Sequence, residues 1–304
     1  MKKIKIALVF PIFNGLDFTK TCLKSLSASF KEVDPRGGIF EIVIADDGSS
    51  DNSQEWIQEH YPKVHILKGD GSLWWSGGVN MAIEYAINNL KADYLLWWNN
   101  DILPAEGYFK NLLTVIKKTD ENTIVGSKIY YADKKDTIWS MGGLFDPKTG
   151  KKSMMGNDQP DSEKFNTPKE ADWLAGMGTL IHASVYNKIG MLDAKNFPQY
   201  HGDSDFTFRA KKNGYKIIVY PELKIYNDKR QSGLQHDESF KRLMDSLVSI
   251  RSNYNIKKDF MFYKIHSTCP RAYFPLLKKH ISYVGGFFKW KLFGLVGIKR
   301  KSNV

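Results

Sequence analysis

The first hundred residues alternate between short apolar runs and segments in which apolar residues recur with helical spacing. The runs are rich in β-branched residues and have the composition of buried strands: 4–10, 41–45, 64–67 and 94–98. Three segments between them have the periodicity of amphipathic helices: 17–29, 53–61 and about 79–90. Asp17 is the expected N-cap of the first helix. The alternation predicts an α/β fold with a mostly parallel sheet flanked by helices.

The pattern is looser after Asp101. Residues 140–170 are rich in Gly, Lys, Asp and Pro, which predicts a long surface excursion or a mobile loop. The elements expected beyond it are a strand and a helix in 172–190, a capped helix in 201–214, and a strand at 215–220 that Pro221 terminates. We therefore predict two domains, an α/β domain over 1–230 and a helical C-terminal tail over 231–304.

Polar clusters directly follow three of the expected strands. Their sequences are FPIFN, DDGSSD and NND. Turns are polar in any protein, but three strand ends this rich in carboxylates and amides exceed what turns require. In parallel sheets, ligands bind outside the carboxyl ends of the strands. The three clusters therefore predict a binding site along one edge of the sheet.

The charge of the chain is concentrated at its C-terminal end. Hydrophobic residues make up 42% of the 304 residues and charged residues 25%, which is enough for a sizeable core and excludes global disorder. The net charge is +11, yet residues 260–304 contain nine Lys or Arg and no acidic residue. The other 35 of the 44 basic residues face 33 acidic ones, so the body is almost neutral. A nucleic-acid-binding protein would carry its basic patch on the folded body, so we expect no nucleic-acid partner.

The basic tail has the composition of a membrane-surface segment. Aromatic and apolar residues alternate with Lys and Arg over 273–301, a mixture suited to anionic lipid headgroups. A pair of ordinary packing helices with solvated basic faces is the alternative. No apolar run reaches the roughly 18 residues of a membrane span, and the N-terminal run breaks at Pro11, which argues against a signal peptide. Cys22 and Cys269 have no metal-ligand spacing. We expect a cytoplasmic protein, peripheral on the inner face of the plasma membrane.

Two polar motifs offer residues for chemistry. The NND cluster combines one carboxylate, Asp101, with amide oxygens, a set that suits Mg²⁺ or Mn²⁺, although a plain turn would have the same composition. Asp203 and Asp205 stand two residues apart near an expected helix start, so they point in different directions. We interpret Asp203 as a general base and Asp205 as structural or orienting, with Arg209 as a possible partner. Alternatively, both are ordinary acidic residues of a first helical turn, where the helix dipole favours negative charge.

The order of these motifs resembles that of inverting family 2 glycosyltransferases with the GT-A fold. The resemblance covers residues 4 to about 228 and rests on six motifs: FPIFNG, IVIADDGSSD, GGVN, WWNND, DWLAGMG and HGDSDFTFR. It implies transfer of a sugar from a nucleotide-diphosphate donor to an acceptor hydroxyl, with Asp203 as the base. It implies a Mg²⁺ or Mn²⁺ cofactor held by Asp101 and Asn227.

The resemblance also implies two sets of binding residues. Those expected at the donor nucleotide are Pro11, Phe13, Asn14, Asp46, Asp47, Gly77, Asn80, Asn99 and Asn100. Those expected at the acceptor are Trp173, Gly176, His201 and Asp205. For three tryptophans a second interpretation stays open: Trp173 equally suits the core, and Trp74 and Trp75 can stack on a ligand or pack beneath the sheet edge.

Three positions depart from the family pattern. Asn99 replaces the first acidic residue of the metal motif, Gly202 replaces the acidic residue before the base, and Asn227 or Asp228 stands where a histidine is often found. These departures bear on the strength of metal binding more than on the reaction class. The WWSGGVN stretch resembles rhamnosyltransferase members, which implies dTDP-rhamnose as donor, with a UDP-hexose nearly as well supported.

The resemblance also implies an acceptor. In bacterial members it is often a glycan linked to a polyprenyl diphosphate, a precursor of surface polysaccharide, and a membrane-bound tail would serve such an acceptor. Two other functional classes are alternatives to a glycosyltransferase. A nucleotidyltransferase would show a basic Gly-rich loop near the first strand, where FPIFNGLDF has no cation. A non-catalytic module that binds sugars or membrane surfaces would tolerate a neutral residue at Asp203.

Overall fold

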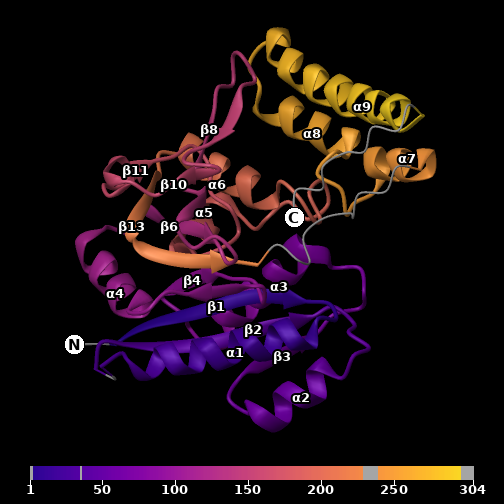
Figure 1. Cartoon of the computed structure of the whole chain (residues 1–304). Coiled ribbons are helices and arrows are strands. Elements are labelled where there is room, and N and C mark those ends of the chain that lie inside the picture. The colour runs from indigo at the N-terminus through magenta and orange to yellow at the C-terminus, as the bar shows by residue number, and fades with distance from the viewer. Residues whose placement is uncertain (1–2, 35, 229–238, 296–304) are drawn as a thin grey trace. The chain divides into compact units, whose positions relative to one another are not determined.

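The structure is a computed structural model that describes residues 3–34, 36–228 and 239–295 (Figure 1). The chain divides into two compact units. The first contains the described residues up to 144 and from 153 to 228, and the second contains 145–152 and the described residues from 239 onward. Each unit is described by itself.

The first unit is built on a mixed sheet of eleven strands among the described residues. Its first half consists of parallel neighbours in the order β4-β1-β2-β3: Tyr94–Trp97, Ile4–Ile12, Gly38–Asp46 and His65–Lys68. The connecting helices are α1 (Leu16–Lys31), α2 (Ser53–His60) and α3 (Trp74–Asn88). The alternation predicted from the sequence is confirmed over this half.

Strand β1 has both of its faces buried, which explains its unbroken apolar run. Ile6 and Leu8 point into the core cluster that contains Leu23 of α1. Ala7 and Val9 point into the cluster on the other face, which contains Val79, Ala82 and Ile83 of α3. The two layers of helices therefore fix β1 in the middle of the sheet.

The second half of the sheet is largely antiparallel, so the expectation of a mostly parallel sheet is correct only for the first half. The strands that extend the sheet beyond β4 are β12 (Thr179–His182), β6 (Thr123–Tyr131), β7 (Thr137–Ser140) and β10 (Gln159–Pro160). Neither β6 nor the helix before it, α4 (Tyr108–Lys118), is anticipated by the sequence pattern. All nine residues of β6 are buried, so the strand lacks the polar alternation that would mark it.

Strand β13 (Lys216–Asn227) continues through Pro221, so the predicted end at that proline is wrong. It runs parallel to β6 with a register shift between Tyr220 and Lys224. A proline has no N–H to donate, and it is tolerated in a strand where a bulge interrupts the ladder. The strand therefore reaches Asn227 and pairs there with β5 (Ile102–Pro104).

Residues 140–170 contain short strands rather than one long loop. The elements here are β8 (Gly143–Phe145), β9 (Lys152–Met154), the 3₁₀ helix η1 (Glu163–Phe165) and β11 (Lys169–Glu170), besides β10. Strands this short carry too few residues for a detectable period in the sequence. Beyond them lie α5 (Ser184–Ile189) and α6 (Gly202–Lys212).

Two helices begin before their predicted starts. Helix α1 begins at Leu16 with Gly15 as its N-cap, in a left-handed conformation, so the assignment of Asp17 as the N-cap is wrong. Helix α3 begins at Trp74 rather than at Val79, so the WWSGG stretch is helical and not a loop. Two adjacent glycines disfavour a helix by propensity, and tertiary contacts override this preference.

The second unit contains three α-helices among the described residues: α7 (Phe240–Val248), α8 (Ile256–His266) and α9 (Tyr273–Leu295). The segment 145–152 belongs to it, because Phe145 packs on the rings of Phe262 and Tyr263. The Tyr263 hydroxyl donates to the Gly150 carbonyl. A buried carboxylate, Asp259, receives Lys279 of α9 at 2.6 Å. None of the helices in the described part of the chain combines the length and hydropathy needed to cross a membrane.

Candidate active site

The turn between β4 and β5 places one carboxylate in a buried position. Asp101 lies directly before β5, and its Oδ1 atom is fully buried with no hydrogen-bond partner among the described residues. Burial raises the pKa of Asp101 to about 6, and the neighbouring Asp228 carboxylate adds to the rise. A buried carboxylate oxygen without a donor is costly, because its lost hydration is not replaced.

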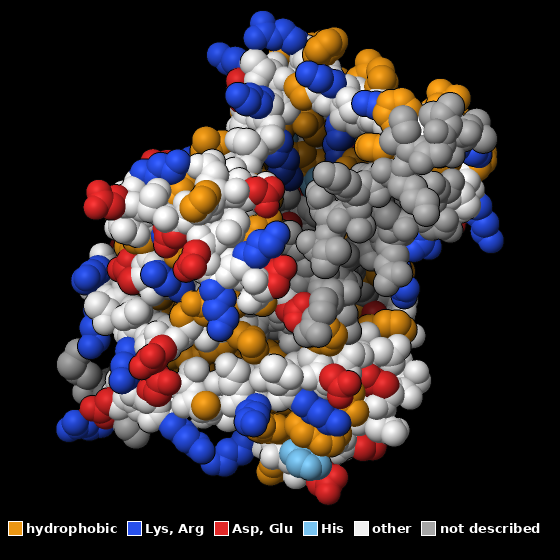
Figure 2. All heavy atoms as spheres, viewed as in Figure 1, with side chains coloured by type: hydrophobic (Ala, Val, Ile, Leu, Met, Phe, Trp, Pro, Cys, Tyr) orange, Lys and Arg blue, Asp and Glu red, His pale blue; other side chains and the backbone are white. Residues whose placement is uncertain are grey.

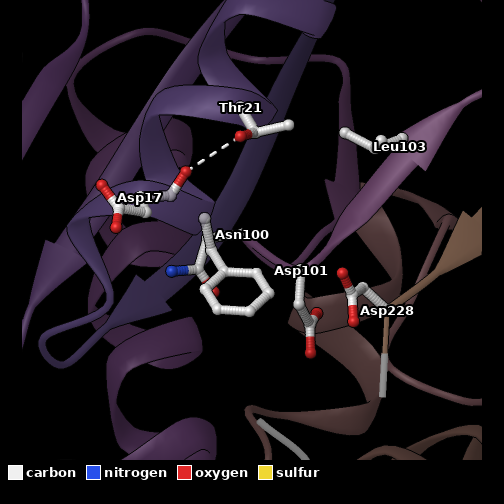
Figure 3. Close-up of a pocket in the computed structure, with 7 residues that line it drawn as sticks. Asp17, Thr21, Asn100, Asp101, Leu103 and Asp228 are labelled. Atoms are coloured by element: carbon white, nitrogen blue, oxygen red, sulfur yellow. Dashed lines mark hydrogen bonds between the residues drawn. The ribbon is translucent and has the colours of Figure 1, made fainter. Parts of the chain in front are cut away.

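The end of β13 brings a second carboxylate, that of Asp228, to the same place. Asn227 pairs with Ile102 of β5, and the backbone N–H of Asp228 donates to the Asp101 carbonyl at 2.9 Å. The Oδ1 atom of Asn227 is also buried without a hydrogen-bond partner in the described chain. Figure 3 shows the side chains of Asp101 and Asp228 next to each other. Strand pairing between distant segments therefore creates this oxygen cluster.

A pocket of about 230 Å³ opens at the cluster. Its lining residues come from α1, from the turn after β4, from β5 and from the end of β13: Asp17, Phe18, Thr21, Asn100, Asp101, Leu103 and Asp228 (Figure 3). Asp17, Asp101 and Asp228 all line it, so a ligand in this pocket would meet three carboxylates.

The oxygen cluster fits a hard divalent cation. Carboxylate and amide oxygens are ligand types of Mg²⁺ and Mn²⁺, and Asp101 and Asn227 each have a buried oxygen with no hydrogen-bond partner among the described residues. No group of three or more His, Cys, Asp or Glu with metal-binding geometry occurs among the described residues. The predicted ligands are Asp101 and Asn227, and this assignment stays a prediction. Asp101 lines the pocket together with Asp228, whereas Asn227 is not among the lining residues.

The two asparagines before Asp101 are engaged within the protein. Asn99 accepts a hydrogen bond at its Oδ1 atom from the indole Nε1 of Trp75 at 2.8 Å. Asn100 donates from Nδ2 to the Thr19 hydroxyl at 3.0 Å and also lines the pocket. The assignment of both to the donor stays a prediction, and only Asn100 is shown to line the pocket.

The turns after β1 and β2 are joined to each other. The Asn14 N–H donates to the Ser49 hydroxyl at 2.8 Å, and the Ser50 N–H donates to the Asn14 side chain at 2.9 Å. Asp46 is buried and accepts from the Ser49 N–H at 2.9 Å. Phe13 is 52% exposed and is therefore open to a ligand, as its predicted role at the nucleotide requires.

Asp47 holds the start of α3. Its Oδ1 accepts from the N–H groups of Gly71 and Leu73, and its Oδ2 accepts from that of Trp74. Asp47 is thus engaged in scaffolding, and its role at the nucleotide stays a prediction.

Three other residues predicted at the donor, Pro11, Gly77 and Asn80, lie on or against α3. Gly78, beside the predicted Gly77, allows close packing on Pro11, since a Cβ atom there would lie 2.6 Å from the Pro11 Cβ. Both ends of the Asn80 amide bond the backbone of Leu192, at 2.9 and 3.0 Å. The described contacts of Asn80 are therefore structural, and the donor roles of all three stay predictions.

The predicted base is fixed by two backbone N–H groups. Asp203 lies in the first turn of α6, and its Oδ2 accepts from the N–H of Gly176 at 2.8 Å. Its Oδ1 accepts from the N–H of Ser204 at 2.7 Å. These bonds hold the carboxylate in one orientation, which a positioned proton acceptor needs. His201 precedes the helix in a left-handed conformation as its N-cap.

Asp205 is separated from Asp203 in both direction and environment. It is 1% exposed, and it accepts from the Arg209 guanidinium at 2.9 Å. Arg209 also donates to the carbonyls of Ile189 and Met191. The expected pairing with Arg209 is confirmed and identifies a structural role for Asp205. Contact with an acceptor remains only a prediction.

Trp173 is buried, with 8% of its surface exposed. A Cβ atom on Gly143 would lie 2.0 Å from its indole ring, so the ring packs directly on that backbone. Its Nε1 lies 3.4 Å from the Leu144 carbonyl. These contacts agree with the interpretation of Trp173 as a core residue, and they leave its predicted acceptor role without support from geometry.

Sequence reasoning did not anticipate the position of Trp75. Its indole reaches Asn99 at the metal turn, and its ring packs on Gly176, where an added Cβ would lie 2.1 Å from the Trp75 Cζ2. Gly176 in turn donates to Asp203. A chain of contacts thus connects the NND turn to the predicted base. In the sequence, Trp74 and Trp75 are an aromatic pair in a Gly-rich stretch, and no motif of defined spacing indicates what they contact.

Comparison with known proteins gives a consistent picture. The family model described as glycosyl transferase family 2 matches residues 7–178, just over half of the chain. Among curated proteins, the low-salt glycan biosynthesis hexosyltransferase Agl10 of Haloferax volcanii is 24% identical over 189 residues. The match covers 59% of this chain and 56% of that protein, so the chain matches little more than half the length of this relative.

Solved structures show the same fold at low identity. GalNAc-T7, solved with UDP, GalNAc and Mn²⁺, has a TM-score of 0.56 and 13% identity; the match covers 94% of this chain and 57% of that one. Residues 1–349 of S. aureus TarS give a TM-score of 0.51 and 15% identity, with 95% and 80% covered. The predicted GT-A fold is confirmed by these likenesses.

Proposed function

The chain belongs to glycosyl transferase family 2, and we propose that it transfers a sugar from a nucleotide-diphosphate donor to an acceptor hydroxyl. The observation that carries the proposal is the buried Oδ1 of Asp101, which has no hydrogen-bond partner among the described residues and lies beside the carboxylate of Asp228. This cluster lies where β4 ends, at the sheet edge at which family members bind their donors. The activity is supported further by the hexosyltransferase relative.

Asp101, Asn227 and Asp228 would hold the Mg²⁺ or Mn²⁺ ion. Such a cation neutralises the negative charge that develops on the leaving nucleoside diphosphate. The protein residues contribute a fixed site, because Asp101 and Asp228 are joined by backbone pairing. The Mn²⁺ in the GalNAc-T7 structure supports this cofactor.

Asp203 is the proposed base. The acceptor oxygen forms a bond to the anomeric carbon as the bond from that carbon to the phosphate oxygen breaks. The hydroxyl proton passes to Asp203, and the nucleoside diphosphate departs with the electron pair. Attack opposite the leaving group inverts the anomeric configuration, and no covalent intermediate is required. The N–H groups of Gly176 and Ser204 hold the carboxylate in position for this step.

The decisive experiment compares the wild-type chain with Asp203→Asn. A panel that includes dTDP-rhamnose and UDP-hexoses, with and without Mn²⁺, first identifies the donor by thermal stabilisation. We expect Asp203→Asn to bind that donor within about two-fold of wild type and to lose at least about 100-fold in transfer, as removal of a general base does. Equal turnover in the two proteins would refute Asp203 as base. A wild type that transfers no sugar would refute the function itself.

The acceptor proposed is a glycan on a polyprenyl diphosphate, reached at the membrane surface through residues 273–301. Apolar side chains of α9 in this range are exposed: Phe274, Leu277, Ile281, Phe288 and Leu292. Lysines accompany them, and α9 contains no acidic residue. Figure 2 shows hydrophobic and basic side chains together over the helices of the second unit.

Vesicle sedimentation tests the membrane proposal. The full chain should bind vesicles of anionic phospholipid and not neutral ones, and Leu277→Ser with Ile281→Ser should reduce binding at least about ten-fold. Leu144→Ser, an exposed leucine of the first unit, serves as the matched control. Equal binding by the α9 variant and the control would contradict the proposal.

A further inference from the structure

We infer that Trp75 is a positioning residue that couples the metal-binding turn to the base. The inference rests on the proposed function and deepens it, because it assigns to Trp75 the alignment of the two halves of the site. Neither the family match nor the motif order assigns a role to this side chain.

The first observation is a two-sided contact of one indole ring. Its Nε1–H donates to the Oδ1 of Asn99 at 2.8 Å, two residues before Asp101. Its benzo edge fills the space next to Gly176, where a Cβ atom would lie 2.1 Å from Cζ2 and 2.3 Å from Cη2. The N–H of Gly176 donates to Asp203 at 2.8 Å. One rigid ring therefore sets the separation between the turn and the segment that orients the base.

The second observation is the way Trp75 itself is held. Trp74 has a φ of 56°, a left-handed conformation that bulky residues rarely adopt, and its N–H is bound by Asp47. Such strain persists only where surrounding contacts determine the backbone. The Trp75 N–H donates to the Gln199 side chain at 3.3 Å.

The next residue anchors the same helix start to the segment that leads into α6. The Ser76 N–H donates to the Pro198 carbonyl at 2.8 Å, and its hydroxyl donates to the Phe197 carbonyl at 2.5 Å. A Cβ on Gly202 would lie 2.1 Å from the Ser76 hydroxyl oxygen. The start of α3 is therefore interlocked with the residues directly before Asp203.

The contact with Trp75 gives the Asn99 side chain a structural role. The family pattern has an acidic residue at this position, and here the side-chain oxygen accepts from Trp75 instead of facing a cation alone. Asp101, Asn227 and Asp228 would then supply the metal ligands, and Asn99 supplies the connection to the base. This division of roles belongs to the present chain, because it depends on an indole donor at position 75.

The test separates positioning from binding. Trp75→Phe removes the Nε1–H donor and the benzo edge, and Asn99→Leu removes the acceptor. For each we expect kcat of sugar transfer to fall about ten-fold, while the donor KM and the affinity for UDP or dTDP with Mn²⁺, measured by calorimetry, stay within about two-fold of wild type. Because the two substitutions remove the same hydrogen bond, the double variant should lose little more kcat than either single variant.

The matched control is Thr123→Val. It removes the hydroxyl that donates to the Asp120 carboxylate at 2.7 Å, at the start of β6, and Thr123 takes part in none of the contacts described for Trp75 or Asp203. We expect it to lower the melting temperature without lowering kcat more than about two-fold. If the control reduces kcat as much as Asn99→Leu does, the effect is general destabilisation and the inference is overturned. Variants at Trp75 and Asn99 with wild-type kcat overturn it as well.

A second pair of substitutions tests the packing contact. Gly176→Ala places a methyl group against the Trp75 ring, whereas Gly286→Ala adds one with no atom within 4 Å. The first should reduce kcat about ten-fold and the second should be neutral. Adding Trp75→Phe to Gly176→Ala removes the clashing benzo atoms and should raise kcat above that of Gly176→Ala alone. Independent, additive losses would overturn the inference, whereas a wild type without transferase activity would first overturn the proposed function.

Discussion

Two acidic turns stand at the carboxyl ends of neighbouring regions of the same sheet, and they differ in what their oxygens do. After β2, Asp46 and Asp47 are buried and accept hydrogen bonds from the backbone of their own turn and of the segment before α3. After β4, Asp101 has a buried oxygen with no donor among the described residues, and Asp228 is its neighbour.

The difference separates scaffolding from ligand binding. The Asp47 carboxylate accepts three backbone N–H groups and thereby holds the start of α3. A buried carboxylate without a donor gains from a cation and costs stability without one. Four predictions test this comparison, beginning with the largest expected effect.

The largest effect is expected for Asp101→Asn. We expect a loss of at least about 100-fold in sugar transfer, equivalent to about 2.7 kcal/mol of transition-state stabilisation. The thermal stabilisation by Mn²⁺ with UDP or dTDP should disappear with it. Asp17→Asn changes an exposed carboxylate that lines the same pocket, and it should leave both measurements nearly unchanged. Equal losses in the two variants would mean that pocket charge, and not a ligand at position 101, is responsible.

Asp47→Ala should act on stability. Three backbone N–H groups lose their acceptor, so the free energy of unfolding should fall on the order of 3 kcal/mol, measured by urea denaturation. The folded fraction should still be stabilised by Mn²⁺ with nucleotide. Asp70→Ala, which removes an exposed cap in the same loop, should have a smaller effect. A stable Asp47→Ala protein that has lost Mn²⁺ binding would reverse the proposed division between the two turns.

The titration of Asp101 gives a prediction with a definite sign. Its folded pKa of about 6 lies above the ordinary 3.8, so Mn²⁺ binding must compete with a proton and should weaken as the pH falls below 6. In the absence of metal, protonation favours the folded state: the stability is fully present below about pH 4 and is lost as the pH rises through 6, by at most about 3 kcal/mol.

The control for this prediction is Asp101→Asn, which should abolish the pH dependence of stability in that window. Chemical denaturation without metal at pH 4, 5, 6 and 7 measures the effect. Asp228→Asn removes a like charge and should shift the transition to lower pH. An unchanged transition in Asp101→Asn would assign it to another group.

The smallest effect is expected for Asn100. Asn100→Ala and Thr19→Val break the same 3.0 Å hydrogen bond, and each should reduce stability by about 1 kcal/mol. Asn100 lines the pocket and Thr19 does not. A rise of a few-fold in donor KM should therefore occur only in Asn100→Ala. Identical KM values in the two variants would place Asn100 with the scaffolding residues.

The comparison also shows which parts of the fold could be predicted from the sequence. The parallel half of the sheet was predictable, because buried strands bounded by polar turns leave a strong pattern. Strand β6 was not predicted because the buried polar residues Ser127 and Lys128 interrupt its apolar run. Helix α4 was not predicted although its apolar residues recur with helical spacing. Pro221 was read as a strand end because a bulge that accommodates proline leaves no signal of its own.

For the site, the sequence shows which residue types are present and in what order, but it does not show which hydrogen bonds their side chains make. Asp101 and Asp203 were singled out from the sequence, and the structure gives each a distinct environment. Asp47 and Asn80 were grouped with ligand-binding residues, yet their polar atoms bond the backbone of Trp74 and Leu192. Trp75 was one of several aromatic residues with no assigned partner.

The sequence by itself determined the buried strands of the parallel half, the order of the family motifs and the strand ends at which polar residues gather, because these follow from local periodicity and composition. Only the tertiary structure decided which oxygens are satisfied. Asp47 finds its donors more than twenty residues away, and Asp101 meets Asp228 through the pairing of β5 with β13. Whether a buried polar atom has a hydrogen-bond partner depends on which distant segment the fold places next to it, and the local sequence does not show that segment.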